Sequence, residues 1–354
     1  MRATIGFHKR GDLRMTRKHK LWALMPALPK DLLVASVRQY EDAGLEGVWS
    51  PQLYGAPFVP LAAAAAVSDR LKLGTGVALA FVRSPLETAS CALDLDMISG
   101  GRAVLGIGPS IKWWNEDWYG VRYGKPLAHL REVIGAVRQI IAKGHTGELG
   151  RIDGEYVKLD LERFKLLAPP LRTEIPIYVP AVFEKTCEMA GEIADGLPGH
   201  PIWNAKWVRD KVAPHLANGL ARSGRARKNF DLNLFLFVAV NEDKRQAIED
   251  ARETIAFYGQ MAQYEAYYEY IGFGSEARAL QAAGARQDHA AMMAACSDEM
   301  VESIVLTGTP DEVRRRLDAM ADIADSFTLS IPFYGLAPDK AAYYTQRIAE
   351  VFYG

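Results

Sequence analysis

The stretch Leu73-Gly74-Thr75-Gly76-Val77 and the later stretch Ala103-Val104-Leu105-Gly106-Ile107-Gly108 decide the fold. Each is an apolar run interrupted by glycines at its end, and a helical segment, Leu86–Ile98, lies between them. Two strands joined by a helix of this length are typical of a parallel pair. The carboxyl ends of parallel strands lie at one edge of the sheet. We therefore expect the two glycine-rich ends to meet there and to let a ligand approach the backbone closely.

The same alternation of strand and helix extends along all 354 residues. Eight segments have the apolar character of strands: Thr4–His8, Gly47–Ser50, Lys72–Ala78, Ala103–Ile107, Ile175–Ala181, Gly196–Pro198, Leu232–Val240 and Ser326–Ile331. Several are continuous apolar runs, as expected of strands that are covered on both faces. Eight such units predict an α/β chain that forms one (β/α)8 TIM barrel over residues 1–354.

Three segments interrupt the alternation and predict insertions after strands one, four and seven of the barrel. Lys9–Pro29 is basic and aromatic and is expected to cap the mouth of the barrel. Residues 147–170 have the pattern of a hairpin, with Tyr156–Leu159 as one arm. Residues 263–300 form the longest segment, in which tyrosines are followed by alanine-rich helical sequence.

Composition excludes several classes of protein. The formal net charge of −1 predicts no bulk attraction to nucleic acid or to an anionic membrane. The apolar run Ala62–Val67 is far too short to span a bilayer, and the N-terminal residues show no apolar signal core. Cys91, Cys187 and Cys296 lie far apart, and the seven histidines have no zinc-binding spacing. These patterns predict no metal site and a reducing, cytoplasmic environment.

In (β/α)8 barrels, ligands bind at the carboxyl ends of the strands. His8 is the only histidine that we place at a predicted strand end, where it suits proton donation near neutral pH. A histidine bonded to a loop carbonyl would give the same sequence. Asn115 follows the fourth predicted strand, and its amide can both donate to and accept from a heterocycle. The loop Pro180–Glu184 leads into a helix whose first N–H groups favour an anion such as a cofactor phosphate.

These residues resemble the bacterial luciferase-like superfamily of (β/α)8 enzymes. The resemblance spans nearly the whole chain and rests on Leu73–Val77, Arg83-Ser84-Pro85, Leu95–Arg102, Leu105–Gly108, Ile175–Val179, Ala194-Asp195-Gly196 and Gly308–Val313. It implies a barrel, usually dimeric, that binds FMN or the deazaflavin coenzyme F420. Asn115-Glu116 with Tyr119-Gly120, and Ser297–Val301, resemble the F420-dependent branch, which includes methylenetetrahydromethanopterin reductases.

That branch typically has a bulge with a non-prolyl cis peptide at the end of the third strand, behind the deazaflavin ring. Gly76-Val77 occupies this position. The chain departs from the family where Pro51-Gln52-Leu53 replaces an acidic residue and a histidine. It also has Ile111 where sugar-phosphate dehydrogenases have a glutamate, so glucose-6-phosphate oxidation is not expected. Phe183-Glu184 replaces a glycine-proline pair, and Phe183 is expected to wall the cofactor.

The resemblance implies an F420-dependent oxidoreductase that moves a hydride between C5 of the deazaflavin and a small carbonyl, imine or alcohol. The expected catalytic residues are His8 and Gln52. The expected cofactor contacts are Thr75, Gly76, Val77, Gly108, Ser110, Asn115, Ala181, Val182 and Phe183. Aromatic residues expected at the mouth (Trp22, Trp49, Trp113 and Tyr267) suggest an apolar or pterin-like substrate. The alternatives are an FMN-dependent monooxygenase and a non-catalytic flavin-binding barrel. The expected partners are a small-molecule substrate and a second copy of the chain.

Overall fold

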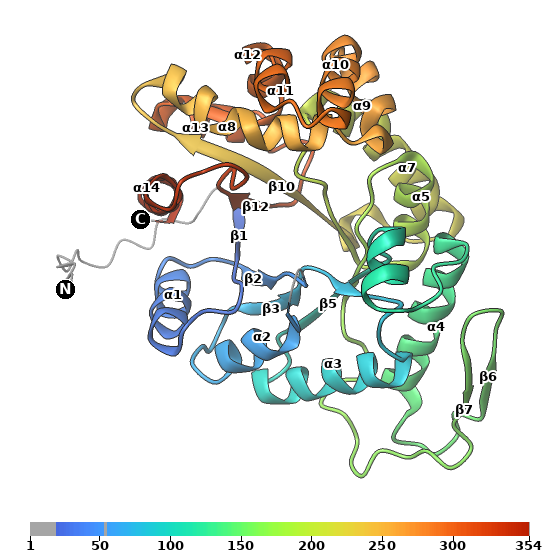
Figure 1. Ribbon diagram of the computed structural model, residues 1–354. Helices are drawn as coiled ribbons and strands as arrows, with labels where there is room; N and C mark the ends of the chain where they lie inside the picture. The colour runs from blue at the N-terminus through green and yellow to red at the C-terminus, as the bar shows by residue number, and fades with distance from the viewer. Residues whose placement is uncertain (1–18, 53–54, 354) are drawn as a thin grey trace.

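The computed structural model describes residues 19–52 and 55–353, and its main sheet closes into a barrel (Figure 1). The parallel strands of the ring are, in order, β1 (Lys20–Leu24), β2 (Gly47–Ser50), β3 (Lys72–Thr75), β5 (Ala103–Gly108), β8 (Ile177–Tyr178), β9 (Gly196–Pro198), β10 (Asp231–Val240) and β12 (Ser326–Ser330). The ring closes because β10 pairs with both β9 and β12, and β12 pairs with β1. The predicted (β/α)8 barrel is confirmed.

Two short strands extend the ring at its carboxyl edge. β4 (Ala78–Leu79) pairs with the end of β5, after a break in the third strand at Gly76-Val77. β11 (Leu306–Gly308) pairs with the last residues of β10. The sequence analysis missed β11, because its three residues run directly into a helix N-cap at Thr309.

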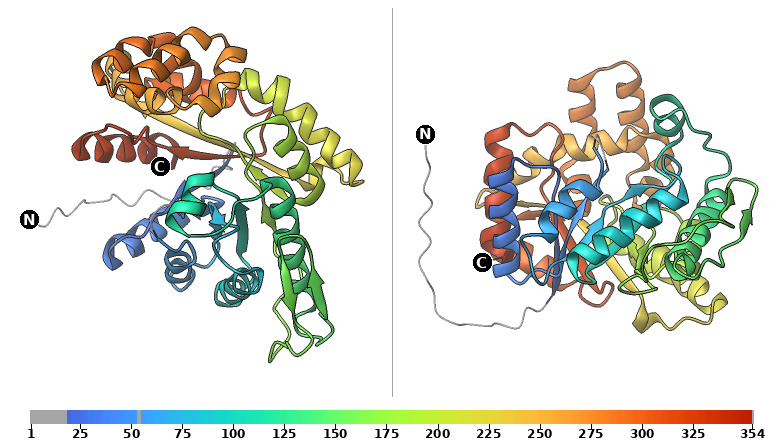
Figure 2. Two further views of the ribbon diagram at one scale, coloured as in Figure 1. Left: turned by 45° about the vertical axis from the view of Figure 1, so that its right-hand side comes forward. Right: turned by 90° about the horizontal axis from the view of Figure 1, so that it is seen from below.

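Helices surround the ring, as the view from below shows (Figure 2). They are α1 (Lys30–Asp42), α2 (Phe58–Ala65), α3 (Pro85–Ser99), α4 (Pro126–Lys143), α5 (Glu184–Ile193), α6 (Ala205–Trp207), α7 (Ala213–Arg222), α8 (Lys244–Gly259), α13 (Pro310–Asp318) and α14 (Pro338–Ile348). Short π and 3-10 turns add η1 (Trp114–Trp118), η2 (Val208–Val212), η3 (Arg227–Asn229) and η5 (Ala349–Tyr353).

The prediction for the first strand needs correction. The expected strand Thr4–His8 lies outside the described residues, and the strand that pairs with β2 and β12 is β1. β1 lies inside Lys9–Pro29, so this segment is not an insertion after the first strand. Only residues 25–29 separate β1 from α1. The apolar run Leu21–Leu24 was overlooked because basic residues crowd the sequence before it.

The other two predicted insertions contain a hairpin and a group of helices, as their sequences indicate. Residues 147–170 contain an antiparallel hairpin of β6 (Arg151–Asp153) and β7 (Lys158–Asp160), which extends away from the ring (Figures 1 and 2). Residues 263–300 form η4 (Ala262–Tyr264), α9 (Glu265–Ile271), α10 (Gly274–Ala285), α11 (His289–Ala295) and the start of α12 (Asp298–Ile304). These helices lie together beside α8, at the top of Figure 1.

The residues that carry the family resemblance stabilise the helix between β3 and β5. Ser84 caps α3 by accepting a hydrogen bond from Glu87 N at 3.0 Å, and Pro85 occupies its first position. The buried Asp96 carboxylate accepts two hydrogen bonds from Arg172 Nε, at 2.9 and 3.0 Å. Arg102 donates five hydrogen bonds. Two go to the last carbonyls of α2 and α3, and three go to Ser68 and Leu71, between α2 and β3. The residues of this signature therefore mainly stabilise the fold.

Two indoles fill the interior of the ring. Trp22 and Trp49 stack with ring centroids 4.2 Å apart and planes 14° apart, and Tyr178 packs against Trp49. A Cβ on Gly74 would lie 2.1 Å from Trp49 Cζ3, and one on Gly76 would lie 2.7 Å from Trp49 Cβ. The glycines of the third strand are thus needed to admit Trp49. Gly74 therefore serves the packing of the core, whereas Gly76 also lines the cavity described below, as the predicted glycine-rich strand end requires.

Candidate active site

A cavity of about 480 Å³ opens at the carboxyl ends of the ring strands. All eight ring strands or the loops that follow them contribute to its wall. The lining residues are Leu24, Trp49, Gly76, Val77, Pro109, Ser110, Ile111, Pro180, Ala181, Val182, Phe183, Thr186, Pro198, Gly199, His200, Pro201, Asn233, Phe235, Gln263, Tyr264 and Thr328. None of these described residues is Asp, Glu, Lys or Arg. The cavity therefore suits an uncharged, largely apolar group.

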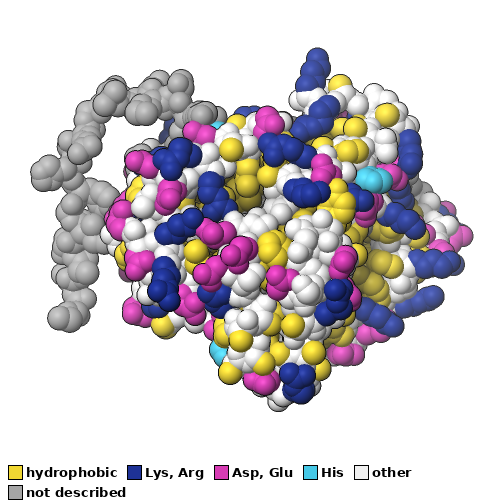
Figure 3. Space-filling view, turned by 90° about the horizontal axis from the view of Figure 1, so that it is seen from above, with side chains coloured by type: hydrophobic (Ala, Val, Ile, Leu, Met, Phe, Trp, Pro, Cys, Tyr) yellow, Lys and Arg dark blue, Asp and Glu magenta, His cyan; other side chains and the backbone are white. Residues whose placement is uncertain are grey.

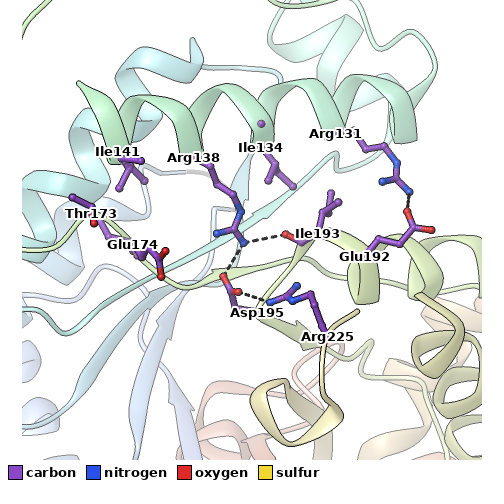
Figure 4. Close-up of a pocket in the computed structure, with 13 residues that line it drawn as sticks. Arg131, Ile134, Arg138, Ile141, Thr173, Glu174, Glu192, Ile193, Asp195 and Arg225 are labelled. Atoms are coloured by element: carbon purple, nitrogen blue, oxygen red, sulfur yellow. Dashed lines mark hydrogen bonds and ion pairs between the residues drawn. The ribbon is translucent and has the colours of Figure 1, made fainter. Parts of the chain in front are cut away.

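A second cavity, of about 530 Å³, lies outside the ring between α4 and α5 (Figure 4). Most of its charged side chains are paired with one another. Arg138 and Arg225 both donate to the Asp195 carboxylate, at 2.8 and 2.6 Å, and Arg131 pairs with Glu192. Asp195 also accepts a hydrogen bond from the backbone of β8 at Ile177. These contacts tie α4 and α5 to the sheet, so we interpret this cavity as structural.

Six of the predicted cofactor contacts line the cavity in the ring. They are Gly76, Val77, Ser110, Ala181, Val182 and Phe183. The peptide bond between Gly76 and Val77 is cis, as the family resemblance implies. Ser110 has a φ of 59°, which is uncommon for a residue other than glycine, and its carbonyl accepts a hydrogen bond from Tyr123 at 2.9 Å.

Three predicted contacts lie behind the wall instead. Thr75 is buried and its hydroxyl donates to Gly106 O at 2.6 Å. The space beside Gly108 is filled by Pro180, which a Cβ would meet at 2.7 Å. Asn115 is fully buried, and its amide donates to the carbonyls of Pro109 and Ile111, at 2.8 and 2.9 Å. These residues shape the loops after β3 and β5 and do not line the cavity.

Of the two expected catalytic residues, only Gln52 can be placed relative to the cavity. His8 lies outside the described residues. Gln52 is buried, and its Oε1 accepts hydrogen bonds from Leu79 N at 2.9 Å and from Arg83 at 2.8 Å. Its Nε2 donates to the Tyr119 hydroxyl at 3.3 Å. With these bonds made, Gln52 braces β4 and the start of α3, and it is not among the lining residues.

The start of α5 is less open to an anion than expected. The N–H groups of Val182 and Phe183 both lie 3.2 Å from the Thr186 hydroxyl and donate to it. Glu184, in the first turn, pairs with Lys211 at 3.4 Å. These two N–H groups are therefore engaged within the protein and do not support the predicted phosphate contact.

The cavity wall contains a polar pair, His200 and Tyr264, that was not predicted from the sequence. His200 follows β9 by two residues, and its Nε2 lies 3.0 Å from the hydroxyl of Tyr264 in η4. Burial lowers the pKa of His200 to about 3 and raises the pKa of Tyr264. Both side chains are therefore neutral near pH 7. His200 could have been predicted from the sequence, because it follows the predicted strand Gly196–Pro198 by two residues. His8 is therefore not the only histidine near a predicted strand end.

A chain of hydrogen bonds runs from the cavity floor into the ring. Thr328 and Asn233 line the floor, and the Thr328 hydroxyl donates to Asn233 Oδ1 at 2.6 Å. Asn233 donates to Ser326, which donates to Asp231. Burial raises the pKa of Asp231. Because every member is bonded, this chain fixes the orientation of the floor's amide and hydroxyl.

The aromatic residues expected at the mouth occupy different places. Trp22 and Tyr267 are fully buried in the core and cannot contact a substrate. Trp49 lines the floor of the cavity, while 48% of Trp113 is exposed. Among the described residues, the wall is thus aromatic mainly through Trp49, Phe183, Phe235 and Tyr264.

Comparison with known proteins identifies the family. A sequence profile described as luciferase-like monooxygenase matches residues 18–326. The chain belongs to this family, and the resemblance noted in the sequence is confirmed.

Relatives narrow the class further. The chain is 32% identical over 317 residues to a Mycobacterium tuberculosis protein provisionally named a coenzyme F420-dependent oxidoreductase, covering 84% of this chain and 88% of the relative. It is 31% identical over 316 residues to the 5,10-methylenetetrahydromethanopterin reductase of Archaeoglobus fulgidus, covering 86% and 90%. The solved structure of the coenzyme F420-dependent tetrahydromethanopterin reductase from Methanopyrus kandleri has the same fold, with a TM-score of 0.75, 23% identity and coverage of 92% and 96%. These relatives are oxidoreductases, which confirms the expected class of enzyme.

The surface and the remaining side chains add little to this picture. On the face shown in Figure 3, basic and acidic side chains are interspersed. Within residues 19–52 and 55–353, no helix is long and apolar enough to cross a membrane. In the same residues, no three His, Cys, Asp or Glu side chains are grouped as a metal site would require.

Proposed function

We propose that the protein is an F420-dependent oxidoreductase that transfers a hydride between the deazaflavin and a small carbonyl, imine or alcohol. The observation that carries this proposal is the cavity at the carboxyl ends of the ring strands, whose described lining residues include Gly76 and Val77 and no charged side chain. A planar heteroaromatic ring fits such a wall, since it needs apolar surface and a few neutral hydrogen-bonding groups. The named relatives support F420 as the source of that ring.

The proposed binding residues fall into two groups. Gly76 and Val77 lie on one side of the cavity, with Trp49 behind Gly76, and Ala181, Val182 and Phe183 follow β8. Ser110 and the Asn233–Thr328 pair supply neutral polar contacts. A bound deazaflavin supplies the hydride chemistry. The protein's part is to hold the ring and the substrate carbon in contact and to exclude water.

An FMN-dependent monooxygenase is the second candidate, because the matching family profile is described as luciferase-like monooxygenase. Titration of the purified protein with F420 and with FMN, followed by absorbance and fluorescence, separates the two. We expect binding of F420 and a change in its redox state with a panel of ketones, imines and alcohols. Tight binding of FMN without binding of F420 would reject the proposal. Binding of F420 without any redox change would instead favour the non-catalytic barrel.

Two matched substitutions test which cavity holds the cofactor. Val182→Trp fills the cavity in the ring, whereas Ala142→Trp fills the cavity between α4 and α5. We expect Val182→Trp to weaken F420 binding by about 100-fold or more, and Ala142→Trp to leave it within about twofold, since a blocked pocket loses most ligand contacts. The reverse result would move the site to the outer cavity.

We also propose that the protein works as a homodimer in a reducing, cytoplasmic environment. The three cysteines are free, and burial raises the pKa of the Cys187 and Cys296 thiols to about 12. The exposed apolar side chains Val59 and Met97 lie on the adjacent helices α2 and α3, where a second copy would cover them. Light scattering during size-exclusion chromatography measures the mass in solution, and a monomer would contradict the proposal.

A further inference from the structure

The side chain of Tyr264 lines the cavity, and its hydroxyl is within hydrogen-bond distance of His200, another residue of the cavity wall. Nε2 of His200 is 3.0 Å away. A phenol oxygen accepts two hydrogen bonds and donates one. If Nε2 of His200 donates to this oxygen, the proton of Tyr264 is free to point elsewhere.

The tautomer of His200 decides whether its Nε2 donates a hydrogen bond to Tyr264 or accepts one from it. The backbone N–H of Ile202 lies 3.4 Å from Nδ1 of His200 and donates to it, so Nδ1 carries no proton. Burial holds the pKa of His200 at about 3, so the ring is neutral near pH 7 and its single proton is on Nε2. Nε2–H therefore donates to Tyr264. The loop is fixed in turn, because Tyr267 donates a hydrogen bond to the carbonyl of Ile202.

We propose that Tyr264 is a catalytic residue, whose O–H faces the cavity and supplies the proton that a carbonyl oxygen or imine nitrogen gains during reduction. His200 is a positioning residue that acts through Tyr264. The assignment rests on the proposed function, in which the hydride comes from the reduced deazaflavin. Tyr264 comes from the segment after the seventh ring strand and is 8% exposed, so it reaches the cavity from outside the ring.

For a ketone, the reduced deazaflavin would give up a hydride from a C–H bond and be oxidised by two electrons. The hydride brings its electron pair to the carbonyl carbon and forms the new C–H bond, while the π bond between carbon and oxygen breaks. Its electron pair takes the proton of Tyr264 and forms the O–H bond of the alcohol. Tyr264 is left as a phenolate, which the Nε2–H of His200 stabilises until water returns a proton. Oxidation of an alcohol follows the same path in reverse.

The orientation of His200 can be measured without any cofactor. ¹⁵N NMR of histidine-labelled protein, with His200→Gln to assign the signal, reports which ring nitrogen carries the proton. We expect a neutral ring protonated on Nε2 from pH 5 to pH 8. A ring protonated on Nδ1, or a charged ring at pH 7, would overturn the proposed orientation of the Tyr264 proton.

Two hydride acceptors, an imine and its N-alkylated iminium ion, together test the proton transfer itself. An imine needs a proton when it gains hydride, whereas its N-alkylated iminium ion does not. In single-turnover oxidation of reduced F420, we expect Tyr264→Phe to slow imine reduction by about 10²- to 10⁴-fold and iminium reduction by less than about threefold. His200→Leu should slow imine reduction less, again with iminium reduction nearly unchanged.

The control for the phenol is Tyr258→Phe, which removes a nearby hydroxyl that is not among the lining residues. We expect it to change neither rate, and F420 affinity is measured for every variant. Equal slowing of both acceptors by Tyr264→Phe, or no slowing of either, would reject Tyr264 as the donor. If wild type does not bind F420, the proposed function fails and the donor assignment fails with it, but the NMR result still decides the orientation of His200.

Discussion

Trp22 and Trp49 stack inside the ring, and Trp49 alone of the two reaches the cavity. One side of Trp49 packs on a fully buried indole, and its other neighbours include the glycines of the third strand. The floor of the candidate active site is therefore part of the hydrophobic core. A change in the core packing below Trp49 will move the floor, although the changed residue lies outside the cavity.

Gly74→Ala tests this coupling. The new Cβ would lie 2.1 Å from Trp49 Cζ3, so either the indole or β3 must shift. Overpacking of this kind costs about 1–3 kcal/mol of unfolding free energy. Chemical denaturation measures the loss, and F420 titration should show weaker binding. Gly135→Ala, at an exposed helical position with no atom within 4 Å of the new Cβ, is the control and should be neutral or slightly stabilising. Equal stabilities of the two variants would contradict this account.

Arg172→Ala tests the buried ion pair of the family signature. The variant leaves the Asp96 carboxylate, which is 1% exposed, without its guanidinium partner. Removing one member of a buried pair costs about 3–5 kcal/mol. Arg151→Ala removes an exposed ion pair with Asp160 in the β6–β7 hairpin and should change the unfolding free energy by less than about 1 kcal/mol. Urea denaturation measures the unfolding free energy of both variants. A small loss in Arg172→Ala would show that other groups satisfy the Asp96 carboxylate.

Substitution of Gln52 separates a bracing role from a catalytic one. Gln52→Ala leaves the N–H of Leu79 without its acceptor, which costs about 1–3 kcal/mol for a buried group. Gln52→Glu keeps that acceptor and the contact with Arg83, so it should recover most of the stability. Neither variant should change the preference among ketones, imines and alcohols. A changed preference in Gln52→Glu, with stability intact, would restore the original prediction that Gln52 faces the substrate.

The pKa of His200 makes stability depend on pH. In the folded state the pKa is about 3, against an ordinary value near 6.5 in the unfolded chain. Between these values the unfolded state binds a proton that the folded state does not, so the free energy of unfolding falls as pH falls. The expected loss from pH 6.5 to pH 5 is roughly 1.5 kcal/mol.

His200→Gln removes this contribution, so the difference between wild type and variant isolates it from other groups. Asp231 acts in the opposite direction, because its raised pKa lets the folded state take up a proton first as pH falls. Urea denaturation at several pH values from 5 to 7.5 gives both curves. Parallel curves would mean that His200 gains its proton as easily in the folded chain as in the unfolded one.

The barrel could be predicted because its evidence is local and repeated. Apolar strands alternate with helices, and Ser84-Pro85 and Thr309-Pro310 mark helix starts in the sequence. β1 was placed wrongly because an apolar run of four residues lies next to a basic stretch, where charge obscures the pattern. Pairing with both β2 and β12, which fixes β1 in the structure, is not a local property.

The candidate site was predicted only in part, for a different reason. The position of a residue after a strand indicates the edge of the sheet on which it lies, but not where its side chain points. Gly76, Val77 and Ala181 line the cavity largely through backbone and small side chains, so position was enough. Gln52 and Asn115 have the right position, but their amides turn to backbone partners. Tyr264 could not be placed, since it reaches the cavity from a segment that follows β10 and α8.

The arrival of Tyr264 from outside the ring divides the cavity wall between two parts of the chain that are held by different contacts. Trp49, Gly76 and Val77 belong to the ring and cannot change without disturbing the core, whereas η4 and α9 follow a helix on the periphery. Evolution or an engineer can thus change Gln263 and Tyr264, which line the cavity, while the buried Tyr267 keeps the segment in place, and can select a new acid group or substrate shape over an unaltered floor. In this architecture, a change of substrate preference is expected to come from Gln263 and Tyr264 rather than from the residues of the ring.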